Sequence, residues 1–444
     1  MPFPADRMGR TSLWIVLAGA LALRLLAVPL VHSVQYTSDE REYLHMARQL
    51  LDDGVIRDSN GDRSVRAPLY PVFLAALLWI PGNSILLAHV AGCLLGTAVV
   101  AFVYALALKV TGARAGALFA AGIAAISPGL VIYSALLQTE MLYIALFLLA
   151  FLLLYALRDQ PGIRTAAGLG FCCGCAALTR PVFLGFIPVL LVLMAWPYKR
   201  VWRAVAGPAA VAAIVAALTI APWTARNWSV LHAFVPVASG GGSSLLTGNN
   251  PYATGTFAVR DGFDRWFAAQ AQAHGVADPA SLDEVGRSSV STAIAMSYVA
   301  HYPGAALALG AKKSYIFWIY PVTHSDSFLP LQALAVAFDA LLLAAAVIGV
   351  AGSGPFRGRW APLGAAVTFF WLVQAVLHAE ARFRLPLVPL IALFAGWGVA
   401  QLLDRGEFRR LLSSPWPRGV IIGGLAVVAI AYGATGIMFL TGAF

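Results

Sequence analysis

The sequence predicts an all-α protein that crosses a membrane many times. Of its 444 residues, 60% are hydrophobic and only 11% are charged, whereas about 25% of residues are charged in an ordinary soluble domain. Several uninterrupted apolar stretches reach the roughly 20 residues that a helix needs to cross the hydrocarbon core. The alternating pattern of a membrane β-barrel is not seen. We therefore expect a polytopic helical membrane protein.

Eleven apolar runs are candidates for membrane helices. They cover residues 13–31, 84–108, 115–133, 141–157, 166–178, 182–196, 204–221, 329–350, 361–377, 385–403 and 420–440. The first run is long, lacks a small-x-small cleavage site and opens a series of spans, so we expect it to be a retained helix rather than a signal peptide. Runs 166–178 and 182–196 are short and separated only by Thr179-Arg180-Pro181. They are expected to form a broken or tilted pair inside the protein.

The basic residues indicate which loops are cytoplasmic. With a cytoplasmic N-terminus, the predicted cytoplasmic connections hold 15 of the 30 Lys and Arg residues, as the positive-inside rule expects. These are Arg7, Arg10, Lys109, Arg114, Arg158, Arg164, Lys199, Arg200, Arg203, Arg357, Arg359, Arg405, Arg409, Arg410 and Arg418. The net charge of +10 therefore reports topology, and we expect no nucleic-acid partner.

Two long segments, 34–83 and 223–328, are expected on the non-cytoplasmic face of one membrane domain that covers residues 1–444. In the first, the apolar spacing predicts an interfacial helix that ends near Gly54, and the apolar run 72–80 is too short to cross. The second holds a Gly/Ser/Asn-rich stretch and amphipathic pieces near 264–273 and 291–300. We place the run 305–320 as a peripheral helix, because a span there would invert the basic-loop pattern.

Three carboxylates are candidates for chemistry at this face. Asp39 and Glu40 begin the interfacial helix, where a partly desolvated carboxylate could take a proton from an attacking hydroxyl. The alternative is that Asp39, with Glu42 three residues later, only caps the helix, which is the commoner role of an Asp at this place. Glu140, at the outer lip of a span, either completes an acidic site or caps its own helix.

Arginines form a second group at the outer ends of helices. A planar guanidinium suits a phosphate, so these residues favour an anionic ligand or leaving group, although anchoring to anionic lipid head groups is the alternative. The candidates are Arg66, Arg180, Arg226, Arg382 and Arg384.

The remaining polar motifs are candidates for substrate contacts. His378, Glu380 and Arg382 lie close together between two spans, and ion pairing of Glu380 with an arginine is the alternative to substrate binding. Asn249 and Asn250 precede a proline, a pattern typical of a turn that leaves sugar binding open. A metal is not required, although a divalent ion is not excluded. The four cysteines are expected to be small apolar helix residues.

Five stretches together resemble the dolichyl-phosphate-mannose protein mannosyltransferase family and its bacterial relatives, including aminoarabinose transferases of lipid A, which share the GT-C glycosyltransferase fold. They occur in family order and cover most of the chain to about Gly396. The stretches are Ser38-Asp-Glu-Arg-Glu-Tyr-Leu, Arg66-Ala-Pro-Leu-Tyr-Pro, Leu178-Thr-Arg-Pro, Pro222-Trp-Thr-Ala-Arg-Asn through Gly248-Asn-Asn-Pro, and Glu380-Ala-Arg-Phe-Arg-Leu-Pro-Leu-Val-Pro.

The resemblance implies an inverting glycosyltransferase that takes a sugar from a polyprenyl-phosphate-linked donor. Asp39 matches the catalytic acidic residue of the family and would act as general base, with Glu40 and Glu140 in support. Donor phosphate would be bound by Arg66, Arg180, Arg226 and Arg384. The substrate would also contact Tyr43, Asn249, Asn250, His378, Glu380 and Arg382. The acceptor, a glycan, lipid or protein, is expected to meet segment 223–328, because the chain ends soon after Leu440 without the soluble domain that many members carry.

The composition, rich in Ala, Gly and Arg, looks bacterial. We therefore expect the inner membrane of a bacterium, with a cytoplasmic N-terminus and a periplasmic active site among membrane lipids. The rival function is a flippase or transporter of lipid-linked sugars, which would bind the donor but need no base. A transporter should show broken helices in both of two repeated halves, whereas the sequence offers a single broken pair.

Overall fold

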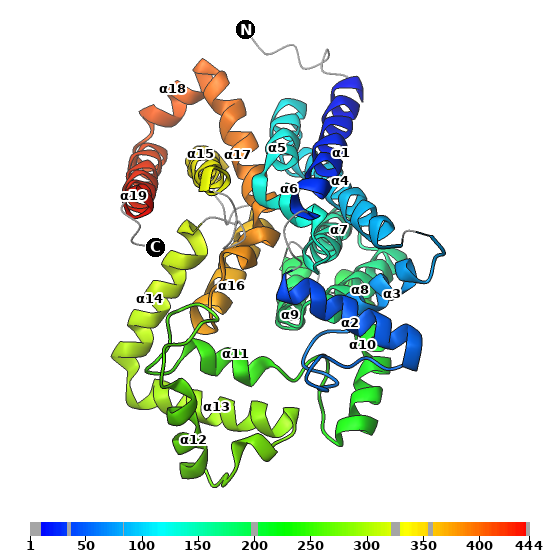
Figure 1. The fold of residues 1–444 in the computed structure, drawn as a ribbon. Coiled ribbons are helices and arrows are strands. Elements are labelled where there is room, and N and C mark those ends of the chain that lie inside the picture. The colour runs from blue at the N-terminus through cyan, green and yellow to red at the C-terminus, as the bar shows by residue number, and fades with distance from the viewer. Residues whose placement is uncertain are drawn as a thin grey trace.

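The computed structural model describes residues 10–32, 37–82, 84–196, 203–320, 329–353 and 358–440. Over these residues the chain is helical, and its only β pairing is one isolated bridge between Ala253 and Val259. Figure 1 shows most helices gathered into one bundle, with the helices of residues 241–301 below it. The expected all-α architecture is confirmed.

Seven helical segments of the described chain are long and apolar enough to cross a membrane. The segment Ala381–Leu403 joins a 3-10 helix, η3, to α17, and together with α7 it is the most deeply buried of the seven. The seven are α1 (Arg10–His32), α4 (Ser84–Thr111), α7 (Glu140–Asp159), α10 (Arg203–Leu231), α15 (Leu329–Ser353), η3 (Ala381–Leu387) with α17 (Val388–Leu403), and α19 (Pro415–Leu440).

Shorter apolar helices complete the bundle. These are α3 (Leu69–Leu78), α8 (Ile163–Thr179), α9 (Val182–Ala195), α16 (Ala361–Val376), and the bent pair α5 (Arg114–Ile126) and α6 (Pro128–Ala135). The chain is thus a multi-pass membrane protein, while the number of eleven spans stays a prediction. Aromatic side chains fill the space between α7, α9 and α16, where the rings of Phe147 and Phe370 meet edge to face at 5.5 Å.

One expected helix is wrong: the run 115–133 is not continuous but bends by 53° between α5 and α6. The reason is Pro128, which lacks an amide hydrogen and disfavours helical geometry at the residue before it. Ser127 accordingly has ψ 117°. The break leaves carbonyl groups at the end of α5 without helical partners.

Arg24 of α1 supplies the missing hydrogen bonds at this break. Its fully buried guanidinium donates to the carbonyl oxygens of Ala125 at 3.1 Å and Ala124 at 3.3 Å, and to the Ser134 hydroxyl at 3.2 Å. A cation within a membrane span is tolerated where backbone carbonyls surround it. Arg24 therefore fixes the bend that leads into the turn between α6 and α7.

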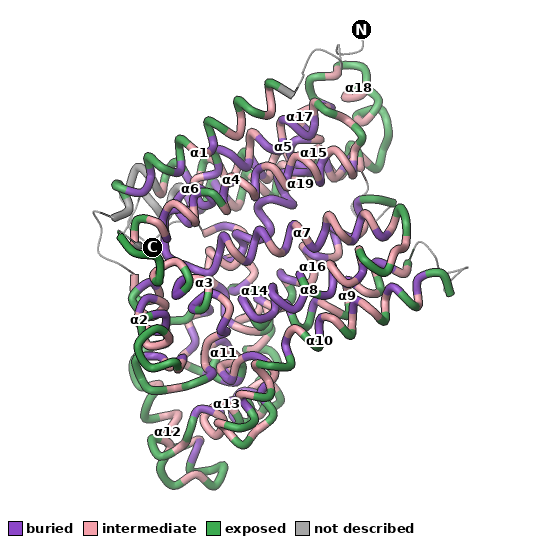
Figure 2. The backbone as a smooth tube through the Cα atoms, turned by 90° about the vertical axis from the view of Figure 1, so that its right-hand side faces the viewer, coloured by how far each residue is buried: buried purple, intermediate pink, exposed green. Residues whose placement is uncertain are grey.

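Most of the other helices lie at the two ends of the bundle. At one end are α2 (Ser38–Asp53), α11 (Gly241–Gly248), α12 (Phe263–Ala273), a 3-10 helix η2 (Pro279–Ser281) and α13 (Glu284–His301), while α14 (Pro303–Ile319) runs from α13 back into the bundle and packs against α16 and η3. Figure 2 places α2, α12 and α13 toward this end and α18 (Arg405–Ser413), which was not expected, at the other. The helix predicted to end near Gly54 is confirmed as α2, with Gly54 at φ 69° as its C-cap, while its place at the membrane interface stays a prediction.

The packing of α4 on this bend gives a stability prediction. A Cβ atom at Gly96 would lie 2.1 Å from Ser134 Oγ and 2.7 Å from Arg24 Nε, whereas one at Gly19 of α1 would meet nothing within 4 Å. Gly96→Ala should therefore destabilise the protein by about 1–3 kcal/mol through overpacking, and Gly19→Ala should cause no loss. The measurement is thermal unfolding of both variants in detergent micelles; equal melting temperatures would contradict the packing described here.

Candidate active site

The N-terminus of α2 is capped by Thr37 and not by Asp39. The Thr37 hydroxyl accepts a hydrogen bond from the amide of Glu40 at 3.1 Å, and the Glu40 carboxylate accepts one from the amide of Thr37 at 2.9 Å. This is a complete capping box. The alternative that Asp39 caps the helix with Glu42 is therefore wrong, since Glu42 accepts from Ser59 instead. Asp39 is left available for another role.

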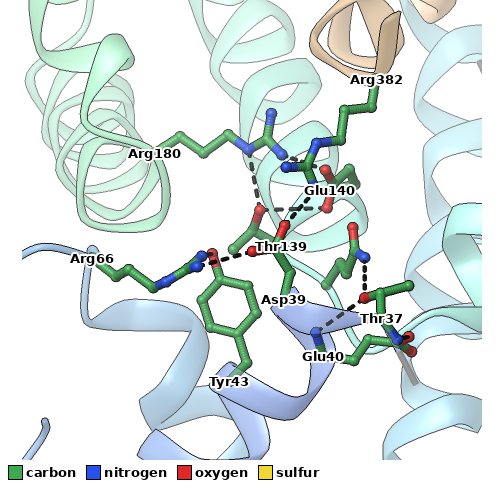
Figure 3. Close-up of polar contacts among 10 residues, drawn as sticks. Thr37, Asp39, Glu40, Tyr43, Arg66, Thr139, Glu140, Arg180 and Arg382 are labelled. Carbon is green, nitrogen blue, oxygen red and sulfur yellow. Dashed lines mark hydrogen bonds and ion pairs between the residues drawn. The ribbon is translucent and has the colours of Figure 1, made fainter. Parts of the chain in front are cut away.

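Glu40 also joins α2 to the turn between α6 and α7. Its second oxygen accepts the amide of Leu137 at 2.9 Å, and Gln138 donates its side-chain amide to the Thr37 hydroxyl at 2.9 Å. The carboxylate is 2% exposed. In Figure 3 Glu40 turns toward Thr37 and away from Asp39. These contacts hold the start of α2 against the turn between α6 and α7.

Asp39 lies between two arginines from distant parts of the chain. One oxygen, Oδ1, is 2.9 Å from Arg66 Nη2, and the other, Oδ2, accepts a hydrogen bond from Arg382 Nη1. Arg66 precedes α3 and also lies over the ring of Tyr43, 5.2 Å from its centre, while Arg382 belongs to η3. Two guanidinium groups therefore converge on one carboxylate, as Figure 3 shows.

The ion pairs determine the charge of Asp39. Burial raises the pKa of the Asp39 carboxyl, but the neighbouring Arg382 and Arg66 guanidinium groups outweigh it and hold the pKa below its usual value. Asp39 is therefore ionised at neutral pH.

A second ion pair lies beside the first. Glu140, the first residue of α7, is 2.5 Å from Arg180 Nη2, and Arg180 Nε donates to the Thr139 hydroxyl at 3.1 Å. The Arg180 guanidinium lies over the rings of Tyr143 and Phe383, 5.5 Å and 5.9 Å from their centres. Three arginines and two carboxylates thus form one cluster, in which Arg382 approaches Glu140 as well (Figure 3).

Arg226 lies outside this cluster and holds the segment that carries Arg66. Its guanidinium donates to the carbonyl oxygen of Arg63 at 3.0 Å and to that of Ile56 at 3.3 Å. From α13, Glu284 accepts the amide of Arg63 at 2.8 Å. The structure therefore places Arg226 as an anchor of the 56–66 segment, away from Asp39.

Arg384 is likewise not brought to the cluster. Its side chain is 2% exposed and forms an ion pair with Asp339 of α15. It also donates to the carbonyl oxygens of Phe317 at 2.8 Å and of Tyr320 at 3.2 Å. These contacts tie η3 to the end of α14, and a phosphate would have to break them to bind there.

The two asparagines named from sequence close the end of α11. The Asn249 side-chain amide donates to Leu245 and Val376, both at 2.8 Å, and Asn250 donates to Leu246 at 2.8 Å. Lys313, which the sequence did not single out, is buried among four oxygen atoms, including Asn249 Oδ1 at 3.2 Å. Burial lowers the pKa of Lys313 to about 8. Asn249 and Lys313 together therefore hold the end of α11 against the end of α16.

His378 and Glu380 bind the same outer segment. Glu380 Oε1 accepts the amide of Phe257 at 3.0 Å, and His378 Nδ1 lies 3.3 Å from the carbonyl oxygen of Ser244. The ring of His378 contacts Phe257 and Phe383. Both residues thus hold segment 244–257 above η3, which carries Arg382.

The described residues contain no group of three or more His, Cys, Asp or Glu side chains placed to hold a metal ion. Cys172, Cys173 and Cys175 are buried on α8 as free thiols.

The tie made by Glu40 gives a second prediction. Glu40→Gln keeps one acceptor oxygen but turns an NH₂ group toward a backbone amide, so it should lower stability by about 1–3 kcal/mol. Glu42→Gln on the same helix is the matched control, because its contacts to Ser59 are solvent-exposed and water can replace them. Thermal unfolding of the two variants is the measurement, and equal losses would show that Glu40 has no special role at this junction.

Comparison with known proteins supports the fold. Residues 65–225 match the family model described as dolichyl-phosphate-mannose-protein mannosyltransferase. The matched segment contains Arg66, Glu140 and Arg180. No match was found among curated protein sequences.

Three solved structures are similar over most of the chain. The Archaeoglobus fulgidus oligosaccharyltransferase AglB, in complex with an inhibitory peptide and a dolichol-phosphate, has a TM-score of 0.51 at 15% identity, covering 97% of this chain and 55% of that one. The A. fulgidus oligosaccharyltransferase in complex with Zn and sulfate has 0.53 at 14%, covering 94% and 53%. ArnT from Cupriavidus metallidurans, bound to undecaprenyl phosphate, has 0.39 at 14%, covering 92% and 81%.

The chain spans about half the length of the archaeal enzyme. At these identities the likeness establishes the fold. This protein is therefore a membrane protein of the GT-C fold, and its residues 65–225 are similar to the dolichyl-phosphate-mannose-protein mannosyltransferase family model.

Proposed function

We propose that this protein is an inverting glycosyltransferase that moves a sugar from a polyprenyl-phosphate-linked donor to an acceptor hydroxyl. The observation that carries this proposal is the placement of Asp39 between Arg66 and Arg382, beside the Arg180–Glu140 pair. An ionised carboxylate and several guanidinium groups at one place are what this reaction requires: a proton acceptor and cations that neutralise a leaving phosphate.

In the proposed reaction the acceptor hydroxyl gives its proton to Asp39 as its oxygen attacks the anomeric carbon of the donor sugar. The bond from that carbon to the phosphate oxygen breaks, and the polyprenyl phosphate leaves with the electron pair. Negative charge grows on the phosphate during this step, so fixed guanidinium donors aimed at it lower the barrier. Arg66, Arg180 and Arg382 are the residues proposed to meet the phosphate.

The family description and the dolichol-phosphate in the archaeal neighbour support a lipid-linked donor. We propose that Tyr43, which stacks under Arg66, lies close to the donor. Glu40 and Arg226 are proposed as positioning residues, and Arg384 as the residue that ties η3 to α14. Asn249, Asn250, His378 and Glu380 are proposed to hold the outer segment, residues 244–257, over the site. The acceptor remains a glycan, lipid or protein, met by segment 223–328.

We further propose that the protein lies in a bacterial inner membrane with its N-terminus in the cytoplasm. The end of the molecule that carries α2, α12 and α13 would then face the periplasm, opposite the basic helix α18 (Figure 2). The number of basic residues on the other connections supports this orientation.

Replacement of Asp39 by asparagine tests the function directly. Asp39→Asn removes the proton acceptor with little change of shape, so transfer of labelled sugar from a polyprenyl-phosphate donor should fall by about 10²–10⁴-fold. The measurement is turnover in proteoliposomes that contain the purified protein, with donor binding recorded in parallel.

Asp53→Asn, in the last turn of the same helix, is the matched control, because Asp53 is half exposed and its contact with Arg57 is a surface pair at 3.9 Å. Its turnover should stay at the wild-type level. Unchanged turnover in Asp39→Asn would remove Asp39 from the reaction. Movement of the donor across the membrane without any transfer would instead identify a transporter.

A further inference from the structure

The geometry of Asp39 poses a chemical problem for its role as a base. A general base needs a lone pair within hydrogen-bond reach of the proton it accepts. Here one carboxylate oxygen pairs with Arg66 and the other with Arg382. Each oxygen keeps a second lone pair, but both oxygens have a cationic partner that lowers their basicity. The lowered pKa of Asp39 has the same origin and makes the paired carboxylate a weak proton acceptor.

The same two guanidinium groups form a natural phosphate site. A phosphodiester presents two non-bridging oxygens on one atom, much as a carboxylate does, and guanidinium groups bind both anions through paired hydrogen bonds. Whatever anion lies between Arg66 and Arg382 therefore takes the position that Asp39 now occupies.

Accessibility separates this pair from the neighbouring one. The side chains of Arg66 and Arg382 are each 32% exposed and that of Asp39 is 16% exposed, so an incoming anion can reach them. In the second pair Glu140 is 1% exposed, and Arg180 is held by Thr139 and two aromatic rings. Exchange of partners is therefore easier at Asp39 than at Glu140.

We propose that Asp39 and the donor phosphate compete for Arg66 and Arg382, so that phosphate binding between these arginines releases the carboxylate to act as the base. This inference rests on the proposed function. Before the donor binds, the two arginines pair with Asp39 and lower its basicity. After the donor binds, they pair with the donor phosphate.

The charges around the site favour this exchange. Counting the three arginines Arg66, Arg180 and Arg382 against Asp39 and Glu140, the cluster carries one net positive charge. One phosphodiester would bring it to zero. Other ionisable groups interact with members of the cluster, namely Tyr43, Tyr70, Tyr133, Tyr143 and His378. After exchange, Asp39 would have a phosphate as neighbour in place of two cations, and a neighbouring negative charge raises the basicity of a carboxylate.

Binding of a polyprenyl phosphate methyl ester tests the competition without any turnover. This probe carries the single charge of a phosphodiester and no sugar to transfer. If Asp39 competes with it, Asp39→Asn should bind the probe about tenfold more tightly than the wild type, because the competing anion is gone. If the arginines stay on Asp39 and need it for their orientation, the affinity of the variant should stay equal or fall. Equal or weaker binding would overturn the proposal.

Glu140→Gln is the control for net charge, because it removes one negative charge from the same cluster. Tighter binding in Asp39→Asn alone would support local exchange, whereas an equal gain in both variants would reduce the effect to general electrostatics and contradict the proposal.

The transfer assay separates this inference from the function on which it rests. Loss of turnover together with tighter probe binding in Asp39→Asn would support both. Loss of turnover with weaker probe binding would keep Asp39 as the base and overturn the exchange. A wild-type protein that binds no polyprenyl phosphate ester would overturn both.

Discussion

The site depends on the double ion pair of Asp39 with Arg66 and Arg382. Asp39 belongs to the start of α2, Arg66 to the segment before α3 and Arg382 to η3. Asp39 and Arg382 are 343 positions apart in the sequence. Removing a charged group from water costs several kcal/mol per ion. Each of the three side chains is therefore stable in this place only when its partners are positioned to pair with it. Much of the surrounding structure can be understood as the means by which these three segments are held at one point.

Three separate ties do this. Glu40 joins α2 to the turn between α6 and α7 through backbone amides. Arg226 and Glu284 fix the 56–66 segment that leads to Arg66. Glu380 and the buried Lys313 fix the outer segment and the end of α16 around η3. The turn held by Glu40 follows the bend at Pro128, which Arg24 completes from within the bundle. A defect in any of these ties would displace a charged group without touching the carboxylate itself.

The sequence was sufficient for the fold class and for the residue types of the site, because hydrophobic run length and the clustering of charge at helix ends are local properties. It was misleading where a single neighbouring residue decides how a helix begins or ends. Asp39 looked like a cap, but Thr37 two residues earlier takes that role, and the run 115–133 looked continuous although Pro128 breaks it. The partners of each arginine could not be read from the sequence at all, since Arg382 and Asp39 meet only through the tertiary fold.

The same limitation explains why the arginines of this chain have different environments that the sequence does not reveal. An arginine buried in a membrane protein is stable when its donors are satisfied, and backbone carbonyls satisfy them permanently. Arg24 and Arg384 have such partners, in addition to the Ser134 hydroxyl and the Asp339 carboxylate, and are buried. Among the described contacts, Arg66, Arg180 and Arg382 instead bind carboxylate, hydroxyl and aromatic side chains. Side-chain partners can move, which is why we propose these guanidinium groups, and Arg66 and Arg382 most of all, for the donor phosphate. Bonds to backbone carbonyls therefore separate Arg24 and Arg384 from the three arginines that we propose for the donor phosphate.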